Sequence, residues 1–154
     1  MYSSASAHRY PLAEFFTDMF QTRLGEQELL ASIMVPRQPA GSSFGYRRFS
    51  YREGEYPLAV AACRLEWNDG ICTGARVAVG GGDVSPKRLP DLEDLLTSTP
   101  VDAGAQADAA HEVPAMLHPV ADVRGSAAWK TTVVADLVAR TVADAARRTE
   151  AVDG

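Results

Sequence analysis

The sequence predicts an α+β fold in which a small antiparallel β-sheet of three to four strands packs against a C-terminal helical bundle. Three observations support this prediction. Strand-like segments precede helical ones, an Asp-Gly turn joins two strands into a hairpin, and the end of the chain carries a helical apolar stripe. Alternating strands and helices would instead predict βαβ units with a parallel sheet.

The composition is that of an ordinary globular protein. Of the 154 residues, 46% are hydrophobic and 23% are charged, which excludes a fibrous or disordered chain. The formal net charge of −5 argues against a nucleic-acid-binding protein, which would be basic. The longest apolar run, residues 58–63, is too short to span a membrane, and residues 1–7 lack the apolar region of a signal peptide. We therefore expect a cytoplasmic protein.

The N-terminal part predicts one helix and one strand. Residues 1–8 are mostly small and polar and are expected to form a loose leader. Residues 11–20 predict a short amphipathic helix that begins at Pro11 and buries its apolar side in the core. That apolar side consists of Leu12, Phe15, Phe16, Met19 and Phe20. Residues 28–35 predict a strand that ends at Pro36, because proline cannot donate a hydrogen bond to a neighbouring strand.

The central part predicts three further strands. Aromatic and arginine residues roughly alternate along residues 44–53, which is typical of a half-exposed strand. Residues 58–67 and 71–79 flank Asp69-Gly70, and this dipeptide suits the positive φ angles of a tight hairpin turn. These two segments therefore predict a β-hairpin.

The hairpin also predicts the state of the two cysteines. A two-residue loop would place Trp67 opposite Cys72 and Cys63 opposite Arg76. The cysteines would then lie ~13 Å apart along the ladder. A disulfide needs Cα atoms within ~7 Å of each other, so both thiols are expected to be free.

The rest of the chain predicts helices. Residues 90–96 begin with proline and acidic residues, which favours a helix start. The alanine-rich residues 102–110 predict a second helix, which ends before Pro114. Ser126 is expected to cap a long last helix whose apolar stripe has a period of 3.6 residues. Residues 9–150 are expected to form one domain.

Gly80, Gly81 and Gly82 follow a strand, so a phosphate-binding loop has to be considered. The dinucleotide pattern G-x-G-x-x-G and the P-loop lysine are both missing from this stretch. A tight backbone passage is therefore the favoured interpretation, with an anion site as the alternative. No histidine or cysteine spacing matches a metal centre, and no metal is expected.

The segment around residues 46–56 offers candidate binding residues. Aromatic rings interleaved with guanidinium groups can stack on a planar anionic ligand, although an edge strand with one charged face has the same pattern. On the first interpretation, the ligand- or cofactor-binding candidates are Tyr46, Arg47, Arg52 and Tyr56.

Four residues are candidates for acid–base catalysis: Glu53, Glu55, His118 and Asp122. Two carboxylates spaced two residues apart on a strand share one face and could share a proton, or could simply face water. Asp122 is expected to accept hydrogen bonds at the start of the last helix and to pair with Arg124. These residues leave open whether the protein is an enzyme.

Taken in order, the motifs resemble the flavoprotein (medium) subunit of molybdenum hydroxylases, the family of carbon monoxide dehydrogenase and xanthine dehydrogenase. Residues 14–36 are similar to the end of its flavin-binding region. Further motifs are similar to its C-terminal domain: Tyr46-Arg47-Arg48-Phe49, Ala59-Val60-Ala61-Ala62, residues 75–86 and residues 122–129. The resemblance covers residues 9–148 and implies the fold of that C-terminal domain.

The resemblance also implies how a cofactor would bind. In the family, an N-terminal domain with two glycine-rich loops holds most of the FAD, and the sequence has no counterpart of that domain. The isolated chain is therefore expected to bind no cofactor, and FAD only if a partner supplies the missing domain. The family's lysine near the flavin is Arg47 here, and its Tyr-Arg pair is Trp129-Lys130.

Two functions follow from the resemblance. In the first, the chain is part of a split or truncated flavin subunit that works in electron transfer with molybdenum hydroxylase subunits. In the second, it resembles a free-standing copy, a cofactor-independent small-molecule-binding protein or enzyme of the cyclase or isomerase type in specialised metabolism. Its pocket would then be lined by Tyr46, Arg47, Arg52, Glu55 and His118, and its exposed apolar surface would favour a dimer. A regulatory or scaffolding module is a third interpretation.

Overall fold

The structure, a computed structural model, describes residues 7–18, 20–97 and 100–150. The chain divides into two units, one that ends at Val35 and one that begins at Pro36. The single domain expected from residue 9 onward corresponds to the second unit, and the inclusion of the first unit in it stays a prediction. Within the described ranges, no helix is both long and apolar enough to cross a lipid bilayer.

The first unit has little regular structure. A one-turn helix, α1 (Leu12–Phe15), precedes two short strands, β1 (Phe16–Asp18) and β2 (Gln21–Thr22), which pair antiparallel. The predicted helix over residues 11–20 is therefore wrong beyond its first turn. The backbone is already extended at Phe16, with φ −86° and ψ 118°.

The apolar side chains of the first unit are not buried. Phe20 is fully exposed, and Met19 lies outside the described residues. The strand predicted for residues 28–35 does not form, and its five large apolar side chains are each more than half exposed. The expected place of the aromatic stripe in the core is wrong as well, because none of the described residues up to Val35 is buried.

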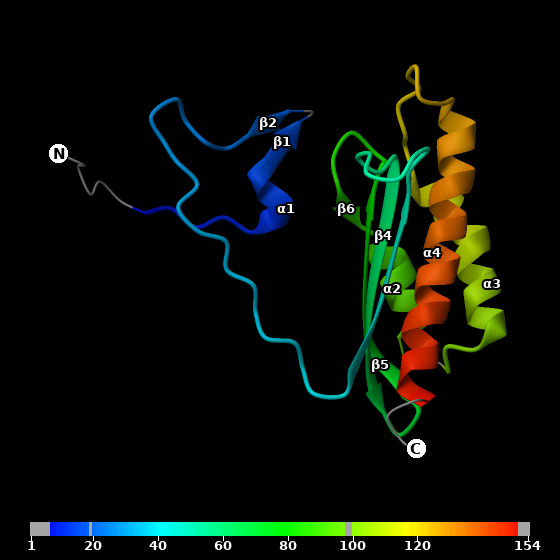
Figure 1. Cartoon of the computed structure of the whole chain (residues 1–154). Helices are drawn as coiled ribbons and strands as arrows, with labels where there is room; N and C mark the ends of the chain where they lie inside the picture. Colours follow the sequence, from blue (N-terminus) through cyan, green and yellow to red (C-terminus); the bar gives the residue numbers. More distant parts are fainter. Residues whose placement is uncertain (1–6, 19, 98–99, 151–154) are drawn as a thin grey trace. The chain divides into compact units, whose positions relative to one another are not determined.

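The second unit contains a four-stranded antiparallel sheet in the order β3-β4-β5-β6 (Figure 1). Its strands are β3 (Ser42–Phe49), β4 (Ala59–Asn68), β5 (Ile71–Gly80) and β6 (Lys87–Arg88). The small antiparallel sheet and the hairpin are thus confirmed. The turn residues Asp69 and Gly70 both have positive φ, at 49° and 76°. The strand predicted for residues 44–53 stops at Phe49.

The hairpin register differs from the expected one by one residue. Cys63 lies opposite Val77 and not opposite Arg76, because Thr73 is an extra residue in β5. Such a β-bulge leaves two residues of one strand opposite one residue of its partner. Both cysteines are free, as predicted. Burial raises the pKa of the Cys63 thiol to about 12.

Helices cover one face of this sheet (Figure 1). They are α2 (Pro90–Leu96), α3 (Ala103–Glu112), the 3-10 turn η1 (Val113–Met116) and α4 (Ala127–Glu150). The three helices predicted after residue 90 are confirmed. Ser126 caps α4, since its hydroxyl oxygen accepts the backbone N–H of Trp129 at 3.2 Å. Helix α4 packs on β3 and β4, and α2 packs on β5.

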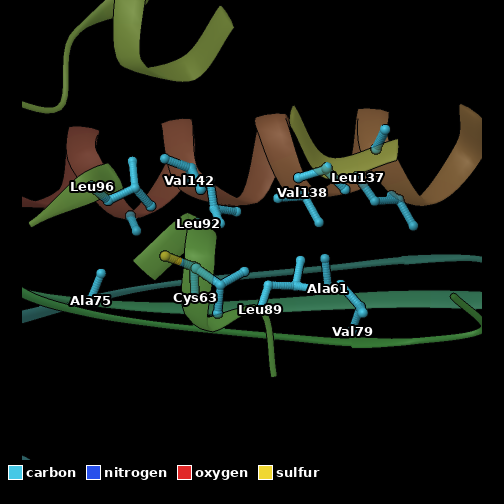
Figure 2. Packing of buried hydrophobic residues seen from close by; sticks show 14 of the residues in the cluster. Ala61, Cys63, Ala75, Val79, Leu89, Leu92, Leu96, Leu137, Val138 and Val142 are labelled. Carbon is cyan, nitrogen blue, oxygen red and sulfur yellow. The ribbon is translucent and has the colours of Figure 1, made fainter. Parts of the chain in front are cut away.

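The core lies between the sheet and these helices. Alternate residues of β4 are buried, and Figure 2 shows Ala61 and Cys63 pointing toward the helices. Leu92 of α2 and Val138 and Val142 of α4 close the core from the other side, each with no exposed surface. The alternation shows that only one face of the sheet contributes to the core.

The long helix approaches β3 closely at one glycine. A Cβ atom at Gly45 would lie 2.0 Å from the carbonyl oxygen of Thr141 in α4. Beside this contact, the indole N–H of Trp67 donates a hydrogen bond to the hydroxyl of Ser43 at 2.7 Å. The position of α4 on the sheet therefore depends on a residue without a side chain at position 45.

Candidate functional site

The helices leave the other face of the sheet uncovered, and we call it the open face. Strand alternation decides which side chains lie on it. One row across the four strands consists of Tyr46, Ala62, Ala78 and Arg88, which are paired in register. The row has an aromatic ring at one end, a guanidinium at the other and two methyl groups between them. Tyr46 is 63% exposed, so its ring is available to a partner or ligand.

A second row lies next to the first, nearer the hairpin turn. Phe44 of β3 pairs with Arg64 of β4, which pairs with Arg76 of β5. Arg64 donates hydrogen bonds to Glu66 and to Gln38, which precedes β3. The open face therefore combines aromatic rings with several guanidinium groups.

Arg47, one of the predicted binding residues, faces the helices instead. Its guanidinium donates two hydrogen bonds to Asp144 of α4, at 2.6 and 3.0 Å. The hydrogen bond from Arg47 is the main reason that the pKa of Asp144 lies below its usual value. Arg147 pairs with the same carboxylate. Adjacent residues of a strand point to opposite faces, so Tyr46 and Arg47 do not share one site.

The loop between β3 and β4 contacts the turn that precedes α4. The hydroxyl of Tyr51 donates to the carbonyl oxygen of Arg124 at 2.6 Å, and the Arg124 guanidinium donates to the carbonyl oxygen of Tyr56 at 3.2 Å. The Tyr51 ring also stacks on Trp129, with ring centroids 5.8 Å apart. These contacts hold the loop in place and leave the Tyr56 side chain 90% exposed.

Asp122 stabilises the turn before α4. Its carboxylate accepts the backbone N–H of Arg124 at 2.9 Å, as predicted, and the Lys130 ammonium at 2.9 Å. The hydrogen bond from Lys130 is the first cause that lowers the pKa of Asp122. The expected buried pair between Asp122 and Arg124 is wrong, because both residues are exposed and the Arg124 side chain reaches Tyr56 instead.

The glycine run is used for packing. Gly81 has a φ of +83°, and a Cβ there would lie 2.1 Å from the carbonyl oxygen of Leu58. A Cβ at Gly82 would lie 2.8 Å from a methyl group of Leu117, and the Gly82 carbonyl accepts the N–H of His118 at 2.9 Å. These close contacts leave no room for a side chain at positions 81 and 82. The glycine run is therefore a tight backbone passage, which was the favoured prediction.

His118 lies apart from the other predicted catalytic residues. It lines a cavity of about 860 Å³ between β6, α2 and η1, together with Lys87, Asp91, Glu112 and others. The loop of residues 50–57 contacts the turn before α4, and none of its residues lines this cavity. The structure therefore does not unite His118 with Tyr56 or Asp122 in one pocket.

The remaining predicted residues lie in the exposed loop before β4. The Arg52 side chain is 84% exposed and lies 3.9 Å from the Glu55 carboxylate. Glu53 is exposed too. Among the described residues no cluster of three histidine, cysteine, aspartate or glutamate side chains could hold a metal ion. The catalytic roles of Glu53, Glu55, His118 and Asp122 stay predictions.

Sequence reasoning missed the arginines of the open face outside residues 46–52. Arg64, Arg76 and Arg88 come from three different strands, and only the register brings them to one face. The signal available in the sequence was alternation: Arg64 follows the buried Cys63 in β4 and should point away from the core.

Comparison with known proteins gives a family and relatives. Residues 44–145 match the family model described as the CO dehydrogenase flavoprotein C-terminal domain. The chain is 34% identical to the nicotine 6-hydroxylase medium subunit of Paenarthrobacter nicotinovorans over 137 residues, which is 88% of this chain and 47% of that protein. It is 26% identical to the carbon monoxide dehydrogenase medium chain of Afipia carboxidovorans, again over 88% of this chain and 47% of the relative. The chain spans about half the length of the curated relatives it matches.

Solved structures agree with these matches. Carbon monoxide dehydrogenase from Hydrogenophaga pseudoflava gives a TM-score of 0.82 at 27% identity, over 88% of this chain and 47% of that chain. Quinoline 2-oxidoreductase from Pseudomonas putida 86 gives 0.81 at 26% identity, over 89% of this chain and 47% of that chain. The predicted α+β architecture is confirmed by these likenesses. The 137 residues matched in the nicotine hydroxylase subunit outnumber the second unit, so that match includes part of the first.

Proposed function

The chain belongs to the CO dehydrogenase flavoprotein C-terminal domain family, and on this premise we propose that it works as the C-terminal part of the FAD-binding medium subunit of a molybdenum hydroxylase. Its role would be to complete a flavin subunit that takes part in electron transfer. The observation that carries this proposal is the extent of the match, nearly all of this chain against about half of each relative.

The described residues do not fit the whole FAD molecule. The glycine run packs closely against Leu58 and Leu117, and it lacks the sequence pattern of a diphosphate-binding loop. The diphosphate would therefore be held by a polypeptide that corresponds to the remaining half of the relatives. When bound there, FAD would supply the redox chemistry, and this chain would supply side chains around it.

The best-placed side chains for that role are on the open face and the adjoining loop. Tyr46 and Tyr56 are both more than half exposed, and Arg52 extends from the same loop as Tyr56. Aromatic faces and guanidinium groups suit a planar anionic cofactor. Arg47 contributes differently, because its pair with Asp144 positions β3 against α4.

The partners in this proposal are molybdenum hydroxylase subunits. Relatives carry the names medium subunit, medium chain and complex subunit alpha, each of which describes one part of an assembly. We place the assembly in the cytoplasm, which the two free cysteines favour. The comparisons lend no support to a free-standing cyclase or isomerase, to a small-molecule ligand or to a dimer.

The proposal is tested by purifying the tagged chain, expressed at its natural level, from its own host. FAD, molybdenum and iron are expected to co-purify with it, measured by flavin fluorescence and by elemental analysis. The recombinant chain alone is expected to be colourless after gel filtration with added FAD. Purification without flavin and metals, or stoichiometric FAD retention by the chain alone, would contradict the proposal.

Single variants of the same tagged chain test the proposed residues. Tyr56→Ala should lower the amount of FAD retained per assembly, because an exposed ring beside the cofactor would be lost. Ile71→Ala, a 45% exposed apolar residue at the hairpin turn, serves as the control and should leave FAD retention unchanged. Equal FAD content in both variants would show that Tyr56 does not contribute to FAD binding.

A further inference from the structure

The open face places two positive charges directly opposite each other. Arg64 of β4 and Arg76 of β5 are register partners, and both side chains lie on the face without helices. Like charges at directly opposed positions of an antiparallel pair destabilise the sheet. Their juxtaposition therefore calls for a compensating negative charge.

The acidic residues of this chain neutralise the positive charge of the open face only in part. The arginines on or beside it are Arg48, Arg64, Arg76 and Arg88. Arg64 pairs with Glu66, Arg88 donates two hydrogen bonds to the buried carboxylate of Glu93, and Arg76 lies 3.6 Å from the same carboxylate. One glutamate is thus shared by two guanidinium groups. Within the described residues, Arg48 has no ion pair.

One nitrogen of the cluster is also without an acceptor. The Nε atom of Arg64 is buried, and it has no hydrogen-bond partner in the described part of the chain. A buried donor that loses water and gains no acceptor costs about 1–3 kcal/mol. An incoming carboxylate would neutralise the excess charge through the exposed part of the Arg64 side chain.

The occupant of this face is not the same face of a second copy of the chain. Pairing two open faces would bring the arginines of one copy against those of the other, which is repulsive. The chain as a whole carries a net charge of −5, so the positive open face differs in sign from the rest of the molecule. Charge complementarity therefore selects a different protein whose surface is acidic.

We propose that the row of Phe44, Arg64 and Arg76, with Arg88 beside it, is the docking surface for an acidic surface of a partner protein. The proposal rests on the proposed function in so far as that function requires a partner. Phe44, 39% exposed, supplies an apolar contact next to the charges. Carboxylates of the partner would pair with Arg76, whose side chain is 54% exposed, and with Arg48.

The test uses the full chain labelled with ¹⁵N and short poly-L-glutamate as the probe. Amide signals of Phe44, Arg64 and Arg76 are expected to shift, and the affinity should fall as salt is added. The double variant Arg64→Gln with Arg76→Gln should weaken binding about tenfold or more. Arg140→Gln, on the exposed side of α4, is the control and should bind like the parent chain.

Three results would overturn the proposal. The first is no binding, or shifts confined to residues away from the open face. The second is equal affinity for inorganic pyrophosphate, which indicates a small-anion site and not a protein-docking surface. The third is a large fall in melting temperature for Arg76→Gln alone, which indicates a structural role for that guanidinium. Flavin co-purification is measured separately, so the proposed function and this inference can fail independently.

Discussion

The two units of the chain use similar apolar residues with opposite results. In the second unit, Leu65, Val77 and Val138 have no exposed surface and lie between a sheet and a helix. In the first unit, Leu29 and Met34 are 85% and 72% exposed. Both units carry apolar runs typical of regular structure, but only the second contains a second apolar layer to receive them.

The difference shows that an apolar pattern predicts an element only together with the surface that buries it. The match to the nicotine hydroxylase medium subunit includes part of the first unit, and that relative is about twice as long as this chain. We therefore interpret the exposed side chains of residues 28–35 as those that the missing half of such a subunit would cover. An isolated segment of this length gains too little from hydrogen bonding alone to hold a strand.

The largest difference in stability between the two units is expected when one leucine of each is replaced by alanine. Leu65→Ala should lower the free energy of unfolding by about 2.7–5 kcal/mol, because it opens a cavity in a fully packed core. Leu29→Ala should change it by less than about 0.5 kcal/mol, because that side chain is already in water. Urea unfolding followed by circular dichroism measures both. A large loss for Leu29→Ala would reveal a core in the first unit.

A smaller contrast is expected from adding one methyl group to a glycine of each unit. Gly45→Ala should cost about 1–3 kcal/mol, because the new Cβ would overlap the Thr141 carbonyl and push α4 from the sheet. At Gly25 the nearest atom would be a carboxylate oxygen of Glu28 at 3.4 Å, which is ordinary contact. Gly25→Ala should therefore leave the thermal melting curve unchanged. Equal melting temperatures for the two variants would show that α4 can move without loss.

The smallest difference between the two units is expected in how their ion pairs make the free energy of unfolding depend on pH. The pKa of Asp144 is lowered by its hydrogen bond with Arg47, so the stability it contributes is present above its unfolded pKa of about 3.9 and is lost as the pH falls through its folded pKa. Asp144→Asn should remove this acid-induced loss and flatten the stability curve below pH 4.

Glu14 of the first unit is the matched control. Its carboxylate lies 3.9 Å from Arg23, and both side chains are about half exposed, so the pair contributes little. Glu14→Gln should leave the pH dependence of unfolding unchanged, measured by urea titration between pH 3 and pH 7. An acid limb in Asp144→Asn identical to that of the parent chain would show that the Arg47 pair adds no stability.

Most of the second unit could be predicted because its signals are local. Asp69-Gly70 indicates the hairpin, Ser126 indicates the start of α4, and the period of the last helix indicates its buried side. The extra residue at Thr73 carries no local signal, and with it the register moved by one position. The helix and strand of the first unit failed for a different reason, because no described residue of that unit is buried.

The candidate site was predicted less well than the fold, because sites depend on which side chains converge. Tyr46 and Arg47 are neighbours in sequence and lie on opposite faces of the sheet. Asp122 pairs with Lys130 in the first turn of α4, where proximity along the chain suggested Arg124. Both errors come from reading closeness in sequence as closeness in space.

The β-bulge at Thr73 changes which residues of β5 face the core. Before it Cys72 points into the core, and after it Ala75, Val77 and Val79 do, whereas strict alternation from Cys72 would send Arg76 inward. Loss of this single residue would thus remove the bulge and leave a regularly alternating strand with the same residues facing the core. The strand can therefore differ by one residue at the bulge without moving its core residues, whereas a one-residue change between Ala75 and Val79 would turn part of the strand over.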